Sequence, residues 1–418
     1  MRRLLAVMVI VSNCIILKAI DFPEFYAILG GDSGFFGDVN TGLTVFPTLL
    51  VPSGGRYEGM GTAFTAVADD SSFLEANPSA SSLLDHSELT VSHNNWIGDT
   101  SVEGLIYTMR FDELGIGFGG KFLYVPFTGY DEWAARDVAA YYSESVATLN
   151  LSYNFFSSYG FYGLALGSNI RIAYRSIPDS LLPSGYSSQS SLGVLADFGA
   201  LTRFNFLKFY PSRTRNFSVG LVLKNLGPKV QSEQLPTRIT AGLAISPIRP
   251  LTLSYDIDLP IHFGLTAEGL ANSFESLTMA GGLEVVLTDF FSMQGGFNYR
   301  GANPGITLGA AVDLPQVSLV VNYTLDLATT FEPLDRISIQ AKLNLGDRGR
   351  LALRLLVDEL YLAGVEAYAA GDLDEAIAMW QETLELDSGF SPARKFLARA
   401  IAQRNNRDRL ESVLVSAT

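Results

Sequence analysis

The residues that could carry catalytic chemistry are few, and their order does not suit it. Gly31-Asp32-Ser33-Gly34 has the letters of a serine-protease nucleophile motif. That protease family places its histidine upstream of the serine, and no histidine precedes Ser33 here. His86, His93 and His262 show none of the spacings that bring ligands onto one metal ion. The sequence therefore predicts no enzyme, no metal site and no cofactor.

The N-terminus indicates export. Met1-Arg2-Arg3 precedes an apolar run from Leu4 to Leu17, and Lys18-Ala19 follows it, which predicts a signal peptide over residues 1–19. Val11-Ser12-Asn13-Cys14 leaves a lipoprotein signal as the alternative, although the apolar run continues beyond it. Cys14 is the one cysteine, so a chain cut after Ala19 would form no disulfide. The formal net charge of −14 and the lack of Lys/Arg stripes predict that no nucleic acid is bound.

The region from Ser87 to Gly346 alternates apolar and polar side chains over runs of about ten residues, enough for a tilted strand to cross a bilayer. In the last run Ile337 and Ile339 alternate with Ser338 and Gln340. Beyond the N-terminus no apolar run approaches the roughly 18 residues of a spanning helix. Because strands can span lipid only when every edge is paired, we predict an antiparallel transmembrane β-barrel of about fourteen strands. We place the strands near 87–97, 102–110, 114–125, 145–156, 160–175, 189–205, 216–226, 237–247, 250–258, 277–288, 290–299, 305–313, 316–325 and 334–345.

The connections between these runs mostly alternate between short and long, as in bacterial barrels. The predicted long connections include Pro126 to Glu144 and Leu259 to Ser276. Two connections break the rule, because Gly98 to Ser101 is short and Leu207 to Arg215 is long. A soluble β-sandwich or soluble barrel remains the alternative, since a strand that packs one face on a core alternates in the same way.

Residues 20–86, between the signal and the first strand, contain three short motifs. They are Phe46 to Pro52, Gly59 to Asp70 and Asn77 to Ala80. Glycines permit close backbone approach, paired aspartates can cap a turn or short helix, and Asn-Pro starts a tight turn. We expect a compact segment here, in which a purely structural role and direct ligand contact both stay open.

These motifs resemble the plug signature of the FadL family of long-chain fatty-acid transporters. The Phe46 to Pro52 lead-in is closer to the PorV/PorQ branch, which includes uncharacterised spirochaetal outer-membrane proteins. The resemblance implies a fourteen-stranded barrel whose N-terminal hatch, residues 20–86, gates the lumen. Ser79 stands where the family usually has alanine, which leaves fatty-acid transport itself an open question. The hatch residues implied are Gly59, Gly61, Asp69, Asp70, Asn77, Pro78 and Ser79.

Glycines crowd the third predicted strand, at Gly115, Gly117, Gly119 and Gly120. Glycine inside a strand often marks a bulge. FadL-type barrels open sideways near this strand, so the resemblance implies a lateral gate. Glycines that only make room for the plug would explain the cluster equally well.

After Gly346 the apolar period becomes helical, and residues 351–418 form a separate predicted module. Its pattern resembles one tetratricopeptide unit followed by a further helix from Pro392 to Asn405, although Ser388 stands where that family has proline. Small Gly364 and Ala376 would let two helices approach, while large side chains fill the seam. A plain helical hairpin is the alternative. The residues that carry the pattern are Leu360, Gly364, Tyr368, Gly371, Ala376 and Trp380.

The resulting prediction is an outer-membrane channel for long-chain fatty acids or similar hydrophobic molecules. With an even strand count the chain enters the first strand and leaves the last strand on the same side of the membrane, the periplasmic side. The helical module is therefore expected in the periplasm. The expected partners are outer-membrane lipid, a hydrophobic small-molecule ligand and a periplasmic protein held by the helical module. The alternative function is a PorV-like scaffold or secretion shuttle that binds protein partners.

Overall fold

The computed structural model describes most of the chain after the N-terminal region. The described residues are 45–96, 100–130, 133, 135–158, 161–177, 190–212, 214–230, 235–260, 278–300, 303–326 and 334–417. The predicted signal peptide, residues 20–44 of the predicted hatch, the Gly31 to Gly34 motif and His262 lie outside them.

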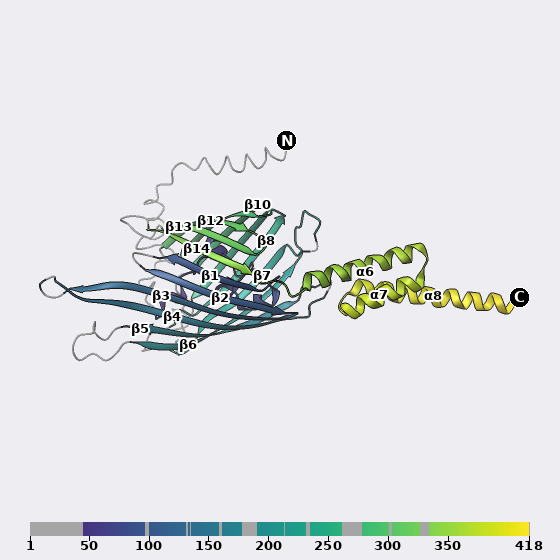
Figure 1. Cartoon of the computed structure of the whole chain (residues 1–418), viewed down its shortest axis with the longest axis horizontal. Helices are drawn as coiled ribbons and strands as arrows, with labels where there is room; N and C mark the ends of the chain where they lie inside the picture. Colours follow the sequence, from purple (N-terminus) through teal and green to yellow (C-terminus); the bar gives the residue numbers. More distant parts are fainter. Residues whose placement is uncertain are drawn as a thin grey trace, which may run out of the picture.

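Fourteen antiparallel strands form one closed barrel, as the alternation predicted (Figure 1). Each strand pairs with its neighbours in sequence, and β1 pairs with β14 from Glu88↔Asn344 to Asn94↔Ser338, which closes the wall. The strands are β1 (Glu88–Asn95), β2 (Ser101–Phe111), β3 (Leu114–Tyr130), β4 (Arg136–Phe155), β5 (Leu164–Ser176), β6 (Ser191–Phe204), β7 (Phe217–Leu226), β8 (Arg238–Ile248), β9 (Leu251–Pro260), β10 (Thr278–Thr288), β11 (Phe291–Arg300), β12 (Asn303–Asp313), β13 (Val317–Asp326) and β14 (Leu334–Asn344).

The two ends of the barrel differ. At one end, which we call the turn end, tight turns at 112–113, 249–250 and 289–290 join the strands. The chain also enters β1 and leaves β14 there, so the C-terminal helices start beside these turns (Figure 1). The opposite end, the loop end, carries the long hairpin of β3 and β4.

The expectation of a long loop from Pro126 to Glu144 was wrong. β3 runs on to Tyr130 and β4 starts at Arg136, and the two strands stay paired through Pro126↔Tyr141. A proline removes a single ladder hydrogen bond and interrupts the side-chain pattern, but it does not end a strand whose flanking residues still pair.

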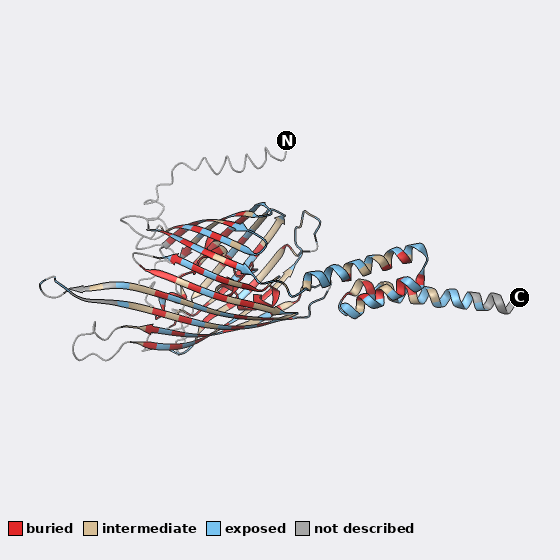
Figure 2. Ribbon diagram, viewed as in Figure 1, coloured by how far each residue is buried: buried red, intermediate tan, exposed pale blue. Residues whose placement is uncertain are grey.

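The barrel is polar inside and apolar outside, the reverse of a soluble protein. Figure 2 shows buried and exposed residues alternating along the strands. In β14 the side chains of Ser338 and Gln340 are each 1% exposed, whereas Ile337 and Ile339 are 49% and 43% exposed. The same alternation in the other strands leaves Leu, Val, Phe and Tyr side chains all around the outer wall. A wall of this kind suits contact with lipid.

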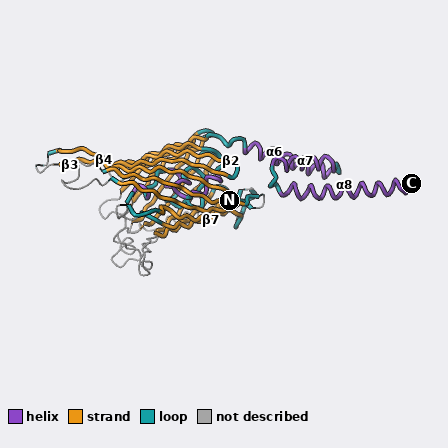
Figure 3. The backbone as a smooth tube through the Cα atoms, turned by 90° about the horizontal axis from the view of Figure 1, so that it is seen from below, coloured by secondary structure: helices purple, strands orange, loops and turns teal. Residues whose placement is uncertain are grey.

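Residues 45–86, which we call the inner segment, fold inside the barrel (Figure 3). They form four short helical turns, and the breaks between them follow the glycines and prolines of the three motifs. Phe46, Phe64 and Phe73 are fully buried among the turns and the wall. The turns are η1 (Pro47–Leu49), α3 (Gly55–Gly59), α4 (Phe73–Ala76) and η2 (Pro78–Leu83).

The C-terminal region forms α6 (Arg350–Ala370), α7 (Leu373–Leu386) and α8 (Ser391–Ala417), which pack on a core of their own. Gly371 ends α6 with a φ of 88°, and the Asp372 side chain caps α7. None of the described helices has the length and apolarity needed to cross a membrane.

Trp380 is the centre of this helical core and is fully buried. A β-carbon on Gly364 would lie 2.5 Å from Trp380 Nε1, so glycine allows α6 to approach α7 closely. Tyr368 packs on Trp380 with ring centroids 5.7 Å apart, and Ala376 is fully buried. Leu360 lies outside this core, so the expectation that its side chain helps to fill the seam between the helices was wrong. α6 turns Tyr361 toward α7 and α8 instead, and the Tyr361 carbonyl accepts a hydrogen bond from the indole N–H of Trp380.

Candidate functional site

Asn77, Pro78 and Ser79 form a buried turn that is bonded to the wall. Asn77 Oδ1 accepts hydrogen bonds from the Ser79 N–H at 3.1 Å and the Ser79 hydroxyl at 2.7 Å. Asn77 Nδ2 donates to the carbonyls of Thr65 at 2.9 Å and of Ala200, in β6, at 3.2 Å. Pro78 starts η2, where its missing N–H has no partner to lose. One amide thus joins the turn, another part of the inner segment and the barrel wall.

The serines of η2 continue this contact on β4. Ser81 Oγ lies 2.6 Å from Ser152 Oγ and 2.5 Å from Asn150 Oδ1. The Ser82 N–H donates to Ser152 Oγ at 2.8 Å. All four residues are buried, so each of these polar groups would be costly to leave unpaired.

Three of the four glycines of β3 make room for the inner segment. A β-carbon on Gly115 would overlap the backbone of Ser81, and one on Gly119 would overlap the Leu74 side chain. Gly117 would bring a β-carbon within 3.0 Å of Phe73. Gly120 faces the outside with open space around it, and β3 stays regularly paired with β2 and β4 through all four positions. The wall has no opening there, and the lateral gate stays a prediction.

Gly59 and Gly61 let the inner segment approach β11 and β13. Gly61 has a φ of +63°, and a β-carbon on it would lie 2.6 Å from the backbone nitrogen of Phe297. On Gly59 a β-carbon would lie 2.7 Å from Asn322 Oδ1, whose amide nitrogen donates to the Gly55 carbonyl. Glycine is the residue that tolerates both the conformation and the distance.

Five charged groups tie the inner segment to the wall near the turn end, and we call them the ionic latch. Arg56 donates to both carboxylate oxygens of Glu284, at 2.8 and 2.5 Å, and to Asp69 at 2.6 Å. Asp70 accepts from Lys342 at 2.9 Å. Burial disfavours the charged form of Asp70, but the cations of Lys342 and Arg56 outweigh it and hold its pKa well below the ordinary value. Removing one partner of a buried ion pair of this kind strongly destabilises the folded protein.

A cavity of about 340 Å³ opens beside the ionic latch, and we call it the turn-end cavity. Its wall includes the turn residues Asp289 and Leu314 and the strand ends at Phe291 and Asn344, so it lies at the turn end. Arg56 faces it from the inner segment.

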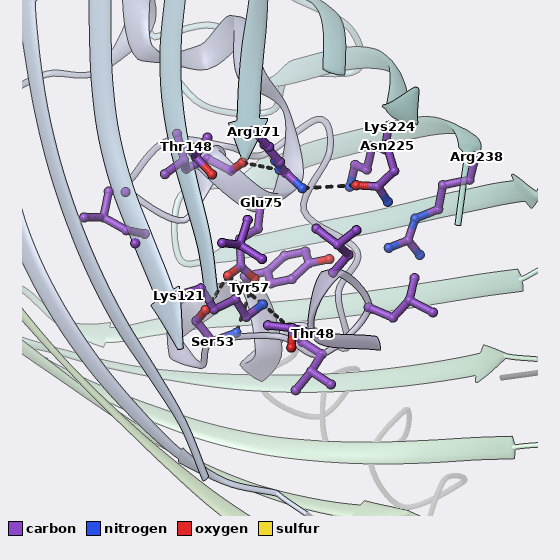
Figure 4. A pocket seen from close by; sticks show the side chains of 18 residues that line it. Thr48, Ser53, Tyr57, Glu75, Lys121, Thr148, Arg171, Lys224, Asn225 and Arg238 are labelled. Carbon is purple, nitrogen blue, oxygen red and sulfur yellow. Dashed lines mark hydrogen bonds and ion pairs between the residues drawn. The ribbon is translucent and has the colours of Figure 1, made fainter. Parts of the chain in front are cut away.

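A second cavity, of about 40 Å³, lies on the other side of the inner segment, and we call it the loop-side cavity (Figure 4). Tyr57, next to Arg56, lines this cavity, and so does Arg238, which starts β8 at its loop end. Its ion pair joins Lys121 of β3 to Glu75 of the inner segment at 3.1 Å. Burial raises the pKa of Glu75, but the stronger combined pull of Lys121 and the hydrogen bonds from Ser53 leaves it lowered.

Sequence reasoning found the inner-segment residues Gly59, Gly61, Asp69, Asp70 and Asn77, but it missed their partners in the wall. Most of the residues it missed are charged strand side chains that point into the lumen. This pattern is visible in the sequence and could have marked them. The missed residues are Lys121, Arg171, Lys224, Arg238, Glu284 and Lys342, together with Arg56 of the inner segment.

The remaining chemistry is sparse. His93 contacts Glu103 at 2.8 Å on the exposed surface of the wall. Within the described residues no group of three or more His, Cys, Asp or Glu side chains is placed to hold a metal ion.

Two solved structures align with much of this chain at low sequence identity. A monoaromatic hydrocarbon channel, CymD, is 11% identical with a TM-score of 0.49, over 71% of this chain and 98% of that one. The toluene transporter TodX of P. putida is 12% identical with a TM-score of 0.46, over 71% and 99%.

The sequence relatives are proteins of Treponema pallidum (strain Nichols), each described as a UPF0164 protein. One is 29% identical over 389 residues, which cover 90% of this chain and 87% of the relative. Another is 26% identical over 84% of this chain and 74% of the relative. The sequence profile of UPF0164, an uncharacterised protein family, matches residues 34–348. Because this match spans more than half of its length, the chain belongs to the UPF0164 family.

Proposed function

We propose that this protein is an outer-membrane channel for hydrophobic molecules and that the inner segment is the hatch that closes its lumen. One observation carries the proposal: the inner segment lies between a cavity toward the loop end and a cavity at the turn end. A segment in this position stands between the two cavities. Passage then requires the inner segment to move.

The outer wall supports a place in the membrane. Most of its strands expose large apolar side chains on the face that points away from the lumen. Aromatic side chains gather near the turn end, where Tyr153 packs against Phe155 at 4.8 Å and Phe204 against Phe217 at 4.9 Å between ring centroids. Aromatic girdles of this kind lie at the membrane interfaces of bacterial barrels.

The cargo we propose is a long-chain fatty acid or a similar apolar molecule. Part of the loop-side cavity is lined by Leu49, Leu74, Ile106 and Val146, which suits an alkyl chain. Its volume of about 40 Å³ is far below the roughly 300 Å³ or more of an occupied ligand pocket. We therefore propose that the inner segment in this position leaves no room for cargo, and that cargo would enter as the segment shifts.

A disulfide that fixes η2 to the wall tests this function. Ser81 and Ser152 lie with their hydroxyl oxygens 2.6 Å apart, so the pair Ser81→Cys and Ser152→Cys should cross-link on oxidation in a Cys14→Ser background. Cells that carry the oxidised protein should lose uptake of a labelled long-chain fatty acid, and a reductant should restore it.

The pair Ser246→Cys and Thr252→Cys is the matched control. Its hydroxyl oxygens lie 2.9 Å apart, but they join β8 to β9 within the wall and leave the inner segment untouched. This disulfide should form without changing uptake. Equal uptake by the oxidised and reduced Ser81/Ser152 pair would refute the hatch.

A second candidate function is a PorV-like scaffold, in which the helical module is a tetratricopeptide-like unit that holds a periplasmic protein. The observation that favours it is the exposure of Leu351, Leu355 and Leu362 on α6, at 59%, 59% and 56%. Deleting residues 351–418 should then abolish partner capture and leave uptake intact.

A further inference from the structure

β7 carries a bulge that turns two successive side chains into the lumen. Leu223 pairs with Phe198 and Leu226 with Ala196, so Lys224 and Asn225 together face one residue of β6. Asn225 has a φ of 58°, which is unusual for a residue other than glycine. Both side chains are buried, although regular strand alternation would point one of them outward. Bulges and left-handed residues of this kind gather at sites where a side chain must be aimed.

The bulge turns the side chain of Lys224 into the lining of the loop-side cavity. Lys224 is 5% exposed, and it makes no hydrogen bond or ion pair with any described residue. The residue opposite it in β8 is another cation, Arg238. Burying a charge is unfavourable unless an opposite charge or hydrogen-bond acceptor compensates it.

The nearby carboxylates are bonded to other groups. Asp197 accepts from Arg171 and from the Asn225 N–H, both at 2.8 Å. Asp256 accepts from the backbone N–H groups of Phe64 and Thr65, at 3.1 and 2.9 Å. Asp258 accepts from Arg238 and Thr240. Glu75 accepts from Lys121 and Ser53.

Among the residues that line the cavity itself, cations outnumber carboxylates. Its lining includes four cations, Lys121, Arg171, Lys224 and Arg238, and one carboxylate, Glu75. The Nε–H groups of Arg171 and Arg238 are buried and have no acceptor among the described residues. Figure 4 shows Lys224, Asn225 and Arg238 along one side of the cavity and the Lys121–Glu75 pair on the other.

We propose that the loop-side cavity binds an anionic oxygen group, a carboxylate or phosphate, through Lys224 and Arg238. The anion would supply acceptors for the Lys224 ammonium and for the buried Nε–H of Arg238, as in other charge-assisted contacts of Lys and Arg. The group is carried by a free ion or by the head of an amphiphile. The apolar side chains of Leu49, Leu74 and Ile106 in the same lining favour the amphiphile. This source rests on the proposed channel function, whereas the anion site itself does not.

Binding by the full chain in a nonionic detergent tests the site with five probes: laurate, dodecyl phosphate, 1-dodecanol, acetate and inorganic phosphate. Laurate and dodecyl phosphate should bind more tightly than the uncharged alcohol of equal length. Lys224→Gln should weaken both anions by about tenfold or more and leave the alcohol unchanged. Lys224→Arg should retain anion binding. Lys229→Gln, at an exposed lysine five positions along the chain, is the matched control and should bind as the unaltered protein does.

The heat-dependent gel shift of a closed barrel confirms that each variant has assembled. Without any probe, Lys224→Gln should also raise the unfolding temperature, because it removes a buried charge that makes no hydrogen bond or ion pair with the described residues. Binding of acetate and phosphate as tight as that of laurate would assign the site to a free anion. Equal affinity for laurate and dodecanol, or equal loss of both in Lys224→Gln, would overturn the anion site but leave the channel intact. The disulfide between Ser81→Cys and Ser152→Cys tests the channel separately.

Discussion

At the scale of single residues, glycines help to position the inner segment, as polar contacts do, because a side chain in their place would collide with it. Gly115 lies against the backbone of Ser81, which has no freedom to move aside because Ser81 and Ser82 are bonded to Ser152. Gly120 lies in the same strand, but a β-carbon on it would have no atom within 4 Å. The two glycines look alike in the sequence and differ completely in what they contact.

Gly115→Ala should therefore displace η2, whereas Gly120→Ala should not. An added methyl that meets backbone costs about 1–3 kcal/mol or more. We expect Gly115→Ala to make residues 45–86 sensitive to protease while the barrel keeps its heat-dependent gel shift. Gly120→Ala is the control and should match the unaltered protein. Reduced uptake in Gly120→Ala with an unaltered inner segment would support the lateral gate instead.

Of the contacts between the inner segment and the wall, the sequence predicted only the residues of the inner segment. Local motifs such as Asn77-Pro78 predict a turn because their effect is on the adjacent backbone. The partner of Arg56 is Glu284, 228 positions away, and no local pattern pairs them. Lys224 and Asn225 are a harder case, because a bulge breaks the rule of alternation that assigns side chains to faces.

At the scale of elements, the ionic latch ties the inner segment to two distant strands. Arg56 joins it to β10 through Glu284, and Asp70 joins it to β14 through Lys342. Asp70 has a lowered pKa in the folded protein. Its contribution to stability is therefore full well above the ordinary carboxyl pKa of about 4 and is lost as the pH falls toward the folded value.

Acid should loosen the inner segment before it opens the barrel. Hydrogen exchange of residues 45–86 should rise as the pH is lowered below about 4, relative to the wall strands. Asp70→Asn should show raised exchange already at neutral pH and respond less to acid. Asp112→Asn, in an exposed turn outside the inner segment, is the matched control. An unchanged pH response in Asp70→Asn would show that the latch does not hold the segment.

The strands were predicted well because each of them obeys one physical rule, a wet face and an apolar face. β7 and β13 begin within one residue of their predicted starts and β14 at its predicted one. The prediction failed at β3 and β4, which extend as a hairpin beyond the alternating region. There no change of environment across the two faces marks where the strands end.

At the scale of the whole molecule, the barrel and the C-terminal helices pack around separate cores. The barrel closes on itself through β1 and β14, and the helices pack around Trp380. Between them, Gly346, Arg348 and Gly349 all have φ values between 58° and 91°. Few contacts cross this link: one is the hydrogen bond from Arg350 to the Asp85 carbonyl at 2.7 Å.

A chain that ends at Gly346 should therefore still form the barrel. A closed barrel has no free edge, so it opens cooperatively and slowly, and the shortened protein should show the same heat-dependent gel shift as the full chain. Protease should cut the full chain first near Gly346 to Leu351 and leave a resistant membrane-bound core. Trp380→Ala, which empties the centre of the helical core, should speed cleavage within residues 351–418 and leave that resistant core unchanged. Loss of the gel shift on truncation would mean that the helices are needed to close the wall. Full solubility without any shift would instead remove the membrane barrel and the channel proposed for it.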